Sequence, residues 1–147
     1  MPVEIIRRAS GSEPASRKLK DIALEILRLV HEERSELSIA LIGDAEMRAL
    51  NSRYRDKDYA TDVLSFPVEP AIPAEPRLLG DVVICVGQAR RQAKAAGRPF
   101  EQEMTVLLIH GVLHLLGYDH ERSAKEARRM GRLEKKLYGA LCAKCGK

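Results

Sequence analysis

The chain has 147 residues, enough for one ordinary domain and too few for two well-packed ones. Hydrophobic residues make up 45% and charged residues 31%, a globular balance that excludes wholesale disorder, collagen-like repetition and a disulfide-dense miniprotein. The net charge is +4, but residues 121–147 hold nine Lys/Arg against three Asp/Glu, and the rest of the chain is slightly acidic. Basic charge concentrated at one end favours a surface that faces a polyanion.

Neither a membrane span nor an export signal is predicted. The longest apolar stretch, Met104–Gly117, contains two histidines and is shorter than the roughly 20 residues that a bilayer crossing needs. Glu4 and a pair of arginines occupy the place where a secretory signal would be apolar. Three cysteines, an odd number, then favour reduced thiols, with Cys85 in the core. We therefore expect a cytoplasmic protein.

The first half of the chain predicts alternating strands and helices. Apolar residues in Val3–Ile6 indicate a short strand, and apolar residues at three-and-four spacing in Ser16–Glu33 indicate an amphipathic helix. Alternation predicts a second strand over Leu37–Leu41. Asp44 is then expected to be the N-cap of a helix that continues towards Tyr54.

The second half predicts two strands followed by three helices. A proline-rich loop separates the two strands, and Gly97 and Pro99 mark where one helix ends and the next begins. The predicted strands are Thr61–Pro67 and Leu79–Val86, and the predicted helices are Gln88–Ala96, Pro99–Leu116 and Ser123–Cys142. This order favours an α+β fold resembling an α/β sandwich, with a small mixed sheet of about four strands and about five helices. We expect one domain over residues 1–147.

Three of the four histidines, His110, His114 and His120, fall within eleven residues, HGVLHLLGYDH. On a helix, the side chains at positions 110 and 114 lie on one face, where they can bind one ion together. A continued helix would turn His120 away, so the helix must stop before it. Gly117 lies where a residue without Cβ can take the left-handed conformation that ends a helix. The spacing predicts a metal site at the end of a long helix.

Three neutral imidazoles and one open position are typical of a catalytic zinc site, so we expect one Zn²⁺, although nickel and copper also accept imidazole. The alternative is that the histidines only pack or form hydrogen bonds in a buried helix. The fourth histidine, His31, is expected to be solvated at the end of the first helix.

The histidine spacing also matches the zinc-peptidase pattern H-E-x-x-H-x-x-G-x-x-H. In that pattern the glutamate is the general base, but here Gly111 occupies its position. A small metallopeptidase is therefore a weaker alternative. Asp119 and Glu121 lie close enough in sequence to orient ligands or to accept protons, and a solvent-facing role is equally open for both.

Three sequence blocks resemble the YbeY family of bacterial single-strand endoribonucleases and rRNA maturation factors. They are LNSRYRDKDYATDVLSFP from Leu50 to Pro67, LLGDVVI from Leu78 to Ile84, and HGVLHLLGYDHE from His110 to Glu121. Their order and approximate spacing match the family. Ala60 departs from the pattern, because many relatives have proline before the Thr-Asp.

The resemblance implies a zinc-dependent hydrolase of single-stranded RNA whose metal is held by His110, His114 and His120. It also implies that Arg55 is important for activity, since an arginine facing the metal can bind a phosphate and stabilise developing charge. Asp62 and Ser65 support the pocket or only form hydrogen bonds at the strand end. The implied substrates are rRNA precursors or defective rRNA, with components of the small ribosomal subunit as further partners.

Basic side chains on two predicted helices are candidates for RNA contacts, and a solvated helix face is the alternative. With two Phe, four Tyr and no Trp, few rings are available to stack on bases, so we expect contacts mainly to phosphates. A non-enzymatic ribosome-assembly factor is a further alternative function. Cys142 and Cys145 supply two of the four ligands of a structural zinc and are expected to lie in an untethered tail. The candidate RNA-binding residues are Arg90, Arg91, Lys94, Arg128 and Arg132.

Overall fold

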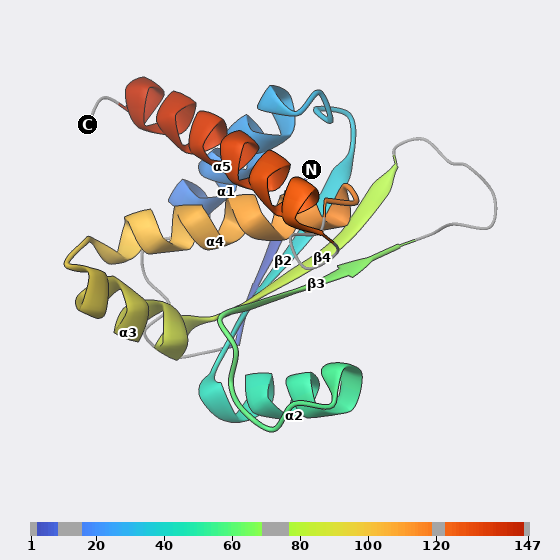
Figure 1. Ribbon diagram of the computed structural model, residues 1–147, viewed down its shortest axis with the longest axis vertical. Helices are drawn as coiled ribbons and strands as arrows, with labels where there is room; N and C mark the ends of the chain where they lie inside the picture. The colour runs from blue at the N-terminus through green and yellow to red at the C-terminus, as the bar shows by residue number, and fades with distance from the viewer. Residues whose placement is uncertain (1–2, 9–15, 69–76, 119–122, 146–147) are drawn as a thin grey trace.

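Five helices and a four-stranded sheet follow one another in the predicted order in a computed structural model (Figure 1). The structure describes residues 3–8, 16–68, 77–118 and 123–145. The elements are β1 (Val3–Arg7), α1 (Ser16–Leu29), β2 (Glu36–Ile42), α2 (Asp44–Arg55), β3 (Val63–Pro67), β4 (Leu78–Cys85), α3 (Val86–Ala96), α4 (Phe100–Leu115) and α5 (Ala124–Cys145). The α+β fold class is therefore confirmed.

The sheet has the strand order β1-β2-β4-β3, in which only β3 runs antiparallel to its neighbour. Parallel pairs need a crossover connection, and α1 supplies one between β1 and β2. The antiparallel pair joins β3 to β4, so β3 forms one edge of the sheet. This edge strand carries Val-Leu-Ser-Phe-Pro and contacts α4, and Thr61 and Asp62, predicted to belong to it, lie just before it.

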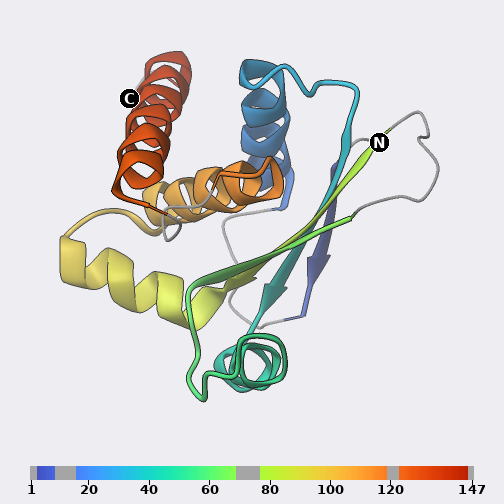
Figure 2. The same ribbon diagram turned by 45° about the vertical axis from the view of Figure 1, so that its right-hand side comes forward.

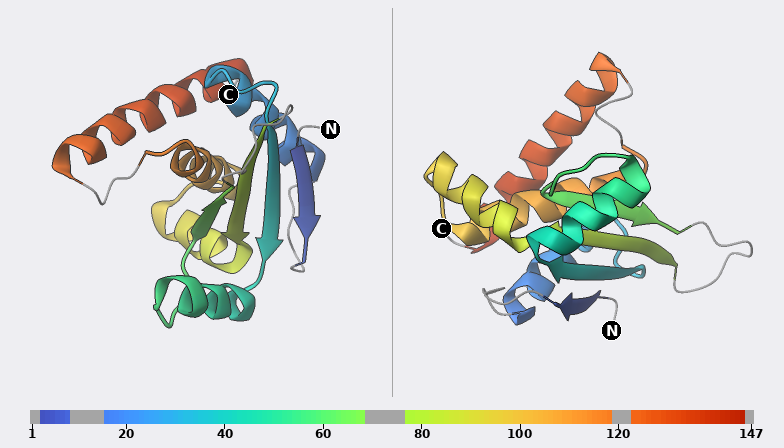
Figure 3. Two further views of the ribbon diagram at one scale, coloured as in Figure 1. Left: turned by 90° about the vertical axis from the view of Figure 1, so that its right-hand side faces the viewer. Right: turned by 90° about the horizontal axis from the view of Figure 1, so that it is seen from below.

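Helices cover both faces of the sheet (Figure 2). The larger core packs α1, α4 and α5 on one face, with Leu108, Val112 and Ile84 fully buried in it. The smaller core lies under α2, where Met47 contacts apolar residues of β2, β3 and β4. Figure 3, right, shows α2 in front of the sheet from that side. Because β4 is covered on both faces, its sequence is a nearly continuous apolar run.

Asp44, predicted as the N-cap of α2, is instead the first residue inside the helix, and Gly43 is the N-cap. The Asp44 carboxylate accepts two hydrogen bonds of 3.0 Å from the Arg91 guanidinium and one of 3.0 Å from the Cys85 thiol. The bond to Arg91 lowers the pKa of Asp44. Burial raises the pKa of Cys85 to about 11, so this thiol stays protonated at neutral pH, as the predicted core position requires.

Several other predicted boundaries also differ from the structure. The first helix ends at Leu29 rather than Glu33, and His31 follows it with a positive φ of 62°. Val86, predicted as the end of a strand, opens α3, and α5 continues to Cys145. The side chains of Cys142 and Cys145 lie outside the described residues. No helix in the described segments combines the length and apolar character needed to span a membrane.

Candidate functional site

A pocket of about 530 Å³ lies between β3, the loop that follows α2, and α4. The wall formed by α4 contributes two imidazoles, and the opposite wall contributes two basic side chains. Residues from the start of β3 and from the loop before it complete the lining of the pocket. The lining residues are Arg55, Lys57, Tyr59, Thr61, Asp62, Val63, Leu64, Ser65, His110 and His114.

His110 and His114 stand on the same face of α4, as predicted. Their ring centroids are 4.8 Å apart and the ring planes are tilted by 51°. The helix ends at Leu115, and Gly117 takes a positive φ of 101°. The backbone amide of Gly117 donates a 3.0 Å hydrogen bond to the carbonyl of His114, which caps the helix end. The predicted helix stop at Gly117 is therefore confirmed, while His120 lies outside the described residues.

The histidine pair fits a metal that prefers nitrogen ligands. Two imidazoles on one tetrahedral zinc, with Zn–N bonds of about 2.0 Å, have ring centroids about 5 Å apart, close to the spacing observed. His110 directs its Nδ1 at the Glu134 carboxylate, 2.8 Å away, so a metal at this site would be bound through the other ring nitrogen, Nε2. Within the described ranges no group of three His, Cys, Asp or Glu side chains could hold a metal. The third predicted ligand, His120, is not among those residues.

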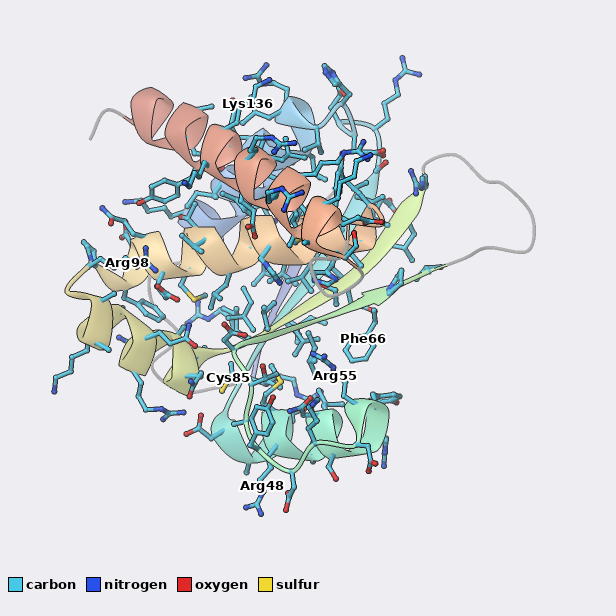
Figure 4. All side chains as sticks on the ribbon, in the orientation of Figure 1. Arg48, Arg55, Phe66, Cys85, Arg98 and Lys136 are labelled. Atoms are coloured by element: carbon cyan, nitrogen blue, oxygen red, sulfur yellow. The ribbon has the colours of Figure 1, made fainter. Side chains whose placement is uncertain are left out.

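Arg55 is the last residue of α2, and its side chain lines the pocket opposite the histidines. In Figure 4 it lies between α2 and the sheet. The chain leaves α2 through Asp56, whose positive φ of 59° turns the backbone into the loop that carries Lys57 and Tyr59. This turn brings two cations, Arg55 and Lys57, to the wall that faces the imidazoles.

Asn51 holds that loop in place. It is fully buried, and its side-chain NH₂ group donates a 2.9 Å hydrogen bond to the backbone carbonyl of Tyr59. Its backbone carbonyl accepts hydrogen bonds from the backbone amides of Asp56 and Lys57. Both ends of the turn are thus tied to one residue of α2. The positions of Arg55 and Lys57 follow from this anchor, which sequence patterns did not single out.

Comparison with known sequences assigns the chain to a family. The family model described as Endoribonuclease YbeY matches residues 6–141. The chain belongs to the YbeY family. A relative from Persephonella marina, named Endoribonuclease YbeY, is 42% identical over 136 residues, which cover 91% of this chain and 89% of the relative. A relative of the same name from Anaeromyxobacter sp. is 46% identical, with 93% of this chain and 70% of the relative covered.

A solved structure has the same fold. The solution structure of TM1509 from Thermotoga maritima superposes with a TM-score of 0.64 at 27% identity, and covers 97% of this chain and 90% of that protein. Two of the three YbeY sequence blocks line the pocket, since one continues from α2 into β3 and one ends α4. The remaining block forms most of β4, which pairs with β3. The resemblance predicted from these blocks is confirmed.

This chain has Gly111 where zinc peptidases have their glutamate, and packing explains why. A Cβ on Gly111 would lie 2.6 Å from Cγ1 of Val82 and 3.3 Å from the Ser65 hydroxyl oxygen. The Ser65 hydroxyl also donates a 2.9 Å hydrogen bond to the carbonyl of Gly111. Position 111 therefore faces the sheet at a contact too close for any side chain, and a general base cannot be placed there.

We expect Gly111→Ala to destabilise the protein. Pushing a methyl group to 2.6 Å from buried, β-branched Val82 costs about 1–3 kcal/mol, and over most of this range the cost exceeds the roughly 1 kcal/mol that alanine gains over glycine inside a helix. Urea unfolding of both proteins measures the difference.

Gly131→Ala is the matched control, because a Cβ there has nothing within 4 Å and the residue lies inside α5. This change should stabilise the protein by up to about 1 kcal/mol. Equal stabilisation by both substitutions would show that the close contact between Gly111 and Val82 does not exclude a side chain at position 111.

The predicted RNA-binding side chains are all exposed, but two of them already contact other side chains of the protein. Arg91 is bound to Asp44, and the guanidinium of Arg90 lies 4.1 Å from the centre of the Phe100 ring. Lys94 lies in the last turn of α3, and Arg128 and Arg132 lie one turn apart on α5. Within the described part of the chain, the charged groups of Lys94, Arg128 and Arg132 are not seen to bind another side chain.

Glu134, Asn51 and Lys57 are site residues that sequence reasoning missed. Glu134 follows the apolar stripe of α5, four residues after Met130 and three before Leu137, which are both buried. An acidic residue within such a stripe signals a buried partner. Asn51 gives a similar signal, since it stands one turn after buried Met47 on the covered face of α2. Neither signal names the partner, which comes from a distant element.

Proposed function

We propose that this protein is a zinc-dependent endoribonuclease that cleaves single-stranded RNA in rRNA maturation and ribosome quality control, and that it works in the cytoplasm. The observation that supports it most directly is one pocket that joins His110 and His114 to Arg55, in a chain of the YbeY endoribonuclease family. His120 is proposed as the third ligand. The proposed substrates are rRNA precursors, and small-subunit components are further partners.

Each proposed role follows from the chemistry of the side chain. A bound zinc ion supplies a water with a pKa near 7 and a Lewis acid for a phosphoryl oxygen. The planar guanidinium of Arg55 can bind two phosphate oxygens at once and stabilise the charge that develops during cleavage. Lys57 adds a second cation on the same wall. Asn51 keeps both cations facing the imidazoles, so little reorganisation is needed when the phosphate binds.

A single strand suits this pocket better than a duplex. The reacting phosphate must reach a space between a sheet edge and a helix, and an unpaired strand can bend and splay its bases to present one phosphate there. The phosphates of an A-form helix are fixed by base pairing. We therefore expect paired RNA to be a poor substrate.

Cleavage of matched RNAs by the purified protein tests the proposal. An unstructured RNA should be cut internally, and the same RNA annealed to its complement should be spared. An unfolded protein substrate in the same assay tests peptidase activity. Bound metal without cleavage of any RNA would contradict the enzyme and favour a non-enzymatic assembly factor, whereas cleavage of the protein substrate would favour a peptidase.

We propose that Lys94, Arg128 and Arg132 hold phosphates along the strand, while Arg90 and Arg91 contribute less because they are engaged within the protein. Replacing both Arg128 and Arg132 by glutamine should weaken binding of a single-stranded RNA and reduce the slope of log affinity against log salt by about 1.4, since each phosphate contact on a single strand contributes about 0.7. Fluorescence anisotropy over a salt series measures the slope.

The matched control is Arg34→Gln, an exposed arginine outside these helices. It should leave the slope unchanged. An unchanged slope in the Arg128/Arg132 double variant would contradict the assignment of these two residues to RNA.

A further inference from the structure

One contact ties the C-terminal helix to the metal-facing wall of the pocket. Oε2 of Glu134, on α5, lies 2.8 Å from Nδ1 of His110, on α4. The two residues are 24 positions apart, so the contact depends on how α5 packs over α4. Both side chains are partly buried, with 28% of His110 and 31% of Glu134 exposed. This burial separates the pair from ordinary surface ion pairs, which contribute little.

Packing holds the Glu134 carboxylate where it is. Met130 and Leu137, one turn before and about one turn after it, are buried against the main core. Tyr138, next to Leu137, packs on the same core and lines a cavity of about 220 Å³ that Glu134 also borders. The backbone of α5 is thus anchored on both sides of Glu134, and its side chain reaches His110 from a fixed base.

The bond selects one of the two neutral forms of the His110 ring. A carboxylate only accepts hydrogen bonds, so its partner Nδ1 must carry the proton. The lone pair then lies on Nε2, the other ring nitrogen. Histidines that bind metals commonly donate their second ring N–H to a carboxylate, which fixes the orientation of the ring and raises its basicity.

The geometry points to Glu134 as a positioning residue for the metal: it holds His110 in the Nδ1–H form with Nε2 available as a ligand, and it makes α5 part of the active site. This inference rests on the proposed function, because it assumes that His110 is a ligand. It adds a functional side chain from an element that the histidine motif does not include.

Three variants separate positioning from simple packing. Glu134→Ala removes the acceptor, Glu134→Gln keeps an oxygen that can still accept from Nδ1 but removes the charge, and Glu33→Gln changes an exposed glutamate far along the chain as a control. Zinc affinity, measured by competition with a chromophoric chelator, should fall about 10- to 100-fold in Glu134→Ala. Glu134→Gln should lose less, and Glu33→Gln should bind as the native protein does.

The tautomer is read directly in the metal-free protein. Long-range ¹H–¹⁵N correlation spectra should show His110 with its proton on Nδ1 in the native protein and in Glu134→Gln. In Glu134→Ala the ring should shift towards the Nε2–H form. If Glu134 acted only in helix packing, Glu134→Ala would leave zinc affinity unchanged. It would also lower the free energy of unfolding by the same amount with and without zinc.

The outcomes also separate this inference from the proposed function. Native zinc affinity and an unchanged His110 tautomer in Glu134→Ala would overturn the inference and leave the metal site intact. Native zinc affinity in His110→Ala would show that His110 is not a ligand, and would contradict the metal-dependent function itself. Loss of zinc affinity in both variants, with the tautomer change in Glu134→Ala, supports both.

Discussion

Replacing His114 by alanine is expected to reduce RNA cleavage to the uncatalysed background and to remove tight zinc binding. His114 supplies one of two imidazoles that face the pocket from α4, with ring centroids 4.8 Å apart. Removing the hydrogen-bond partner of a ligand lowers zinc affinity by about 10- to 100-fold. Removing the ligand itself should lower zinc affinity further. Metal content by mass spectrometry and cleavage of a single-stranded RNA, measured on one preparation, test this.

His31→Asn is the matched control for this change. His31 lies just after α1 with a positive φ, a conformation that asparagine tolerates better than most residues. The control should retain zinc and cleavage. Full metal content in folded His114→Ala would contradict the proposed ligand set, whatever happens to cleavage.

Replacing Arg55 by alanine is expected to reduce cleavage by about 10²–10³-fold while zinc content stays native, because in the proposed mechanism the guanidinium stabilises charge in the transition state and does not hold the metal. Arg55 lines the wall opposite the histidines and is fixed there by the turn that Asn51 anchors. Arg55→Lys should recover only part of the rate, since an ammonium group cannot form the bidentate contact. Single-turnover cleavage rates measure the step concerned.

Arg53→Ala is the control for Arg55, because it removes the same charge from an exposed position of the same helix outside the pocket lining. Its cleavage rate should remain near that of the native protein. Equal losses in the two variants would mean that general positive charge on α2, and not a specific phosphate contact, supports the reaction.

Local patterns were sufficient for the order of the elements and for the helix stop beside the histidines. The spacing of apolar residues predicted α1 and α5, and the alternation in Leu37–Leu41 predicted β2. The stop at Gly117 followed from a geometric need, since three imidazoles at this spacing cannot share one side of a continuous helix. These predictions depend on neighbours within a few residues.

Contacts between distant elements account for what the sequence patterns did not reveal. Asp44 looked like a helix cap, but its carboxylate is bound by Arg91, 47 residues later. No prediction from the sequence concerned Glu134, which the packing of α5 on α4 places beside His110. The opposite wall of the pocket depends on the buried amide of Asn51. Each of these partners is set by how helices and sheet pack together.

The dependence of cleavage on zinc is the most direct test that the histidines and Arg55 form one hydrolytic site. The metal is removed with a chelator, the chelator is dialysed away, and cleavage of a single-stranded RNA is followed as zinc is added back in small steps. Cleavage should be absent at first and should reach its plateau near one zinc per chain. Native rates in the metal-free protein would contradict a zinc-dependent mechanism.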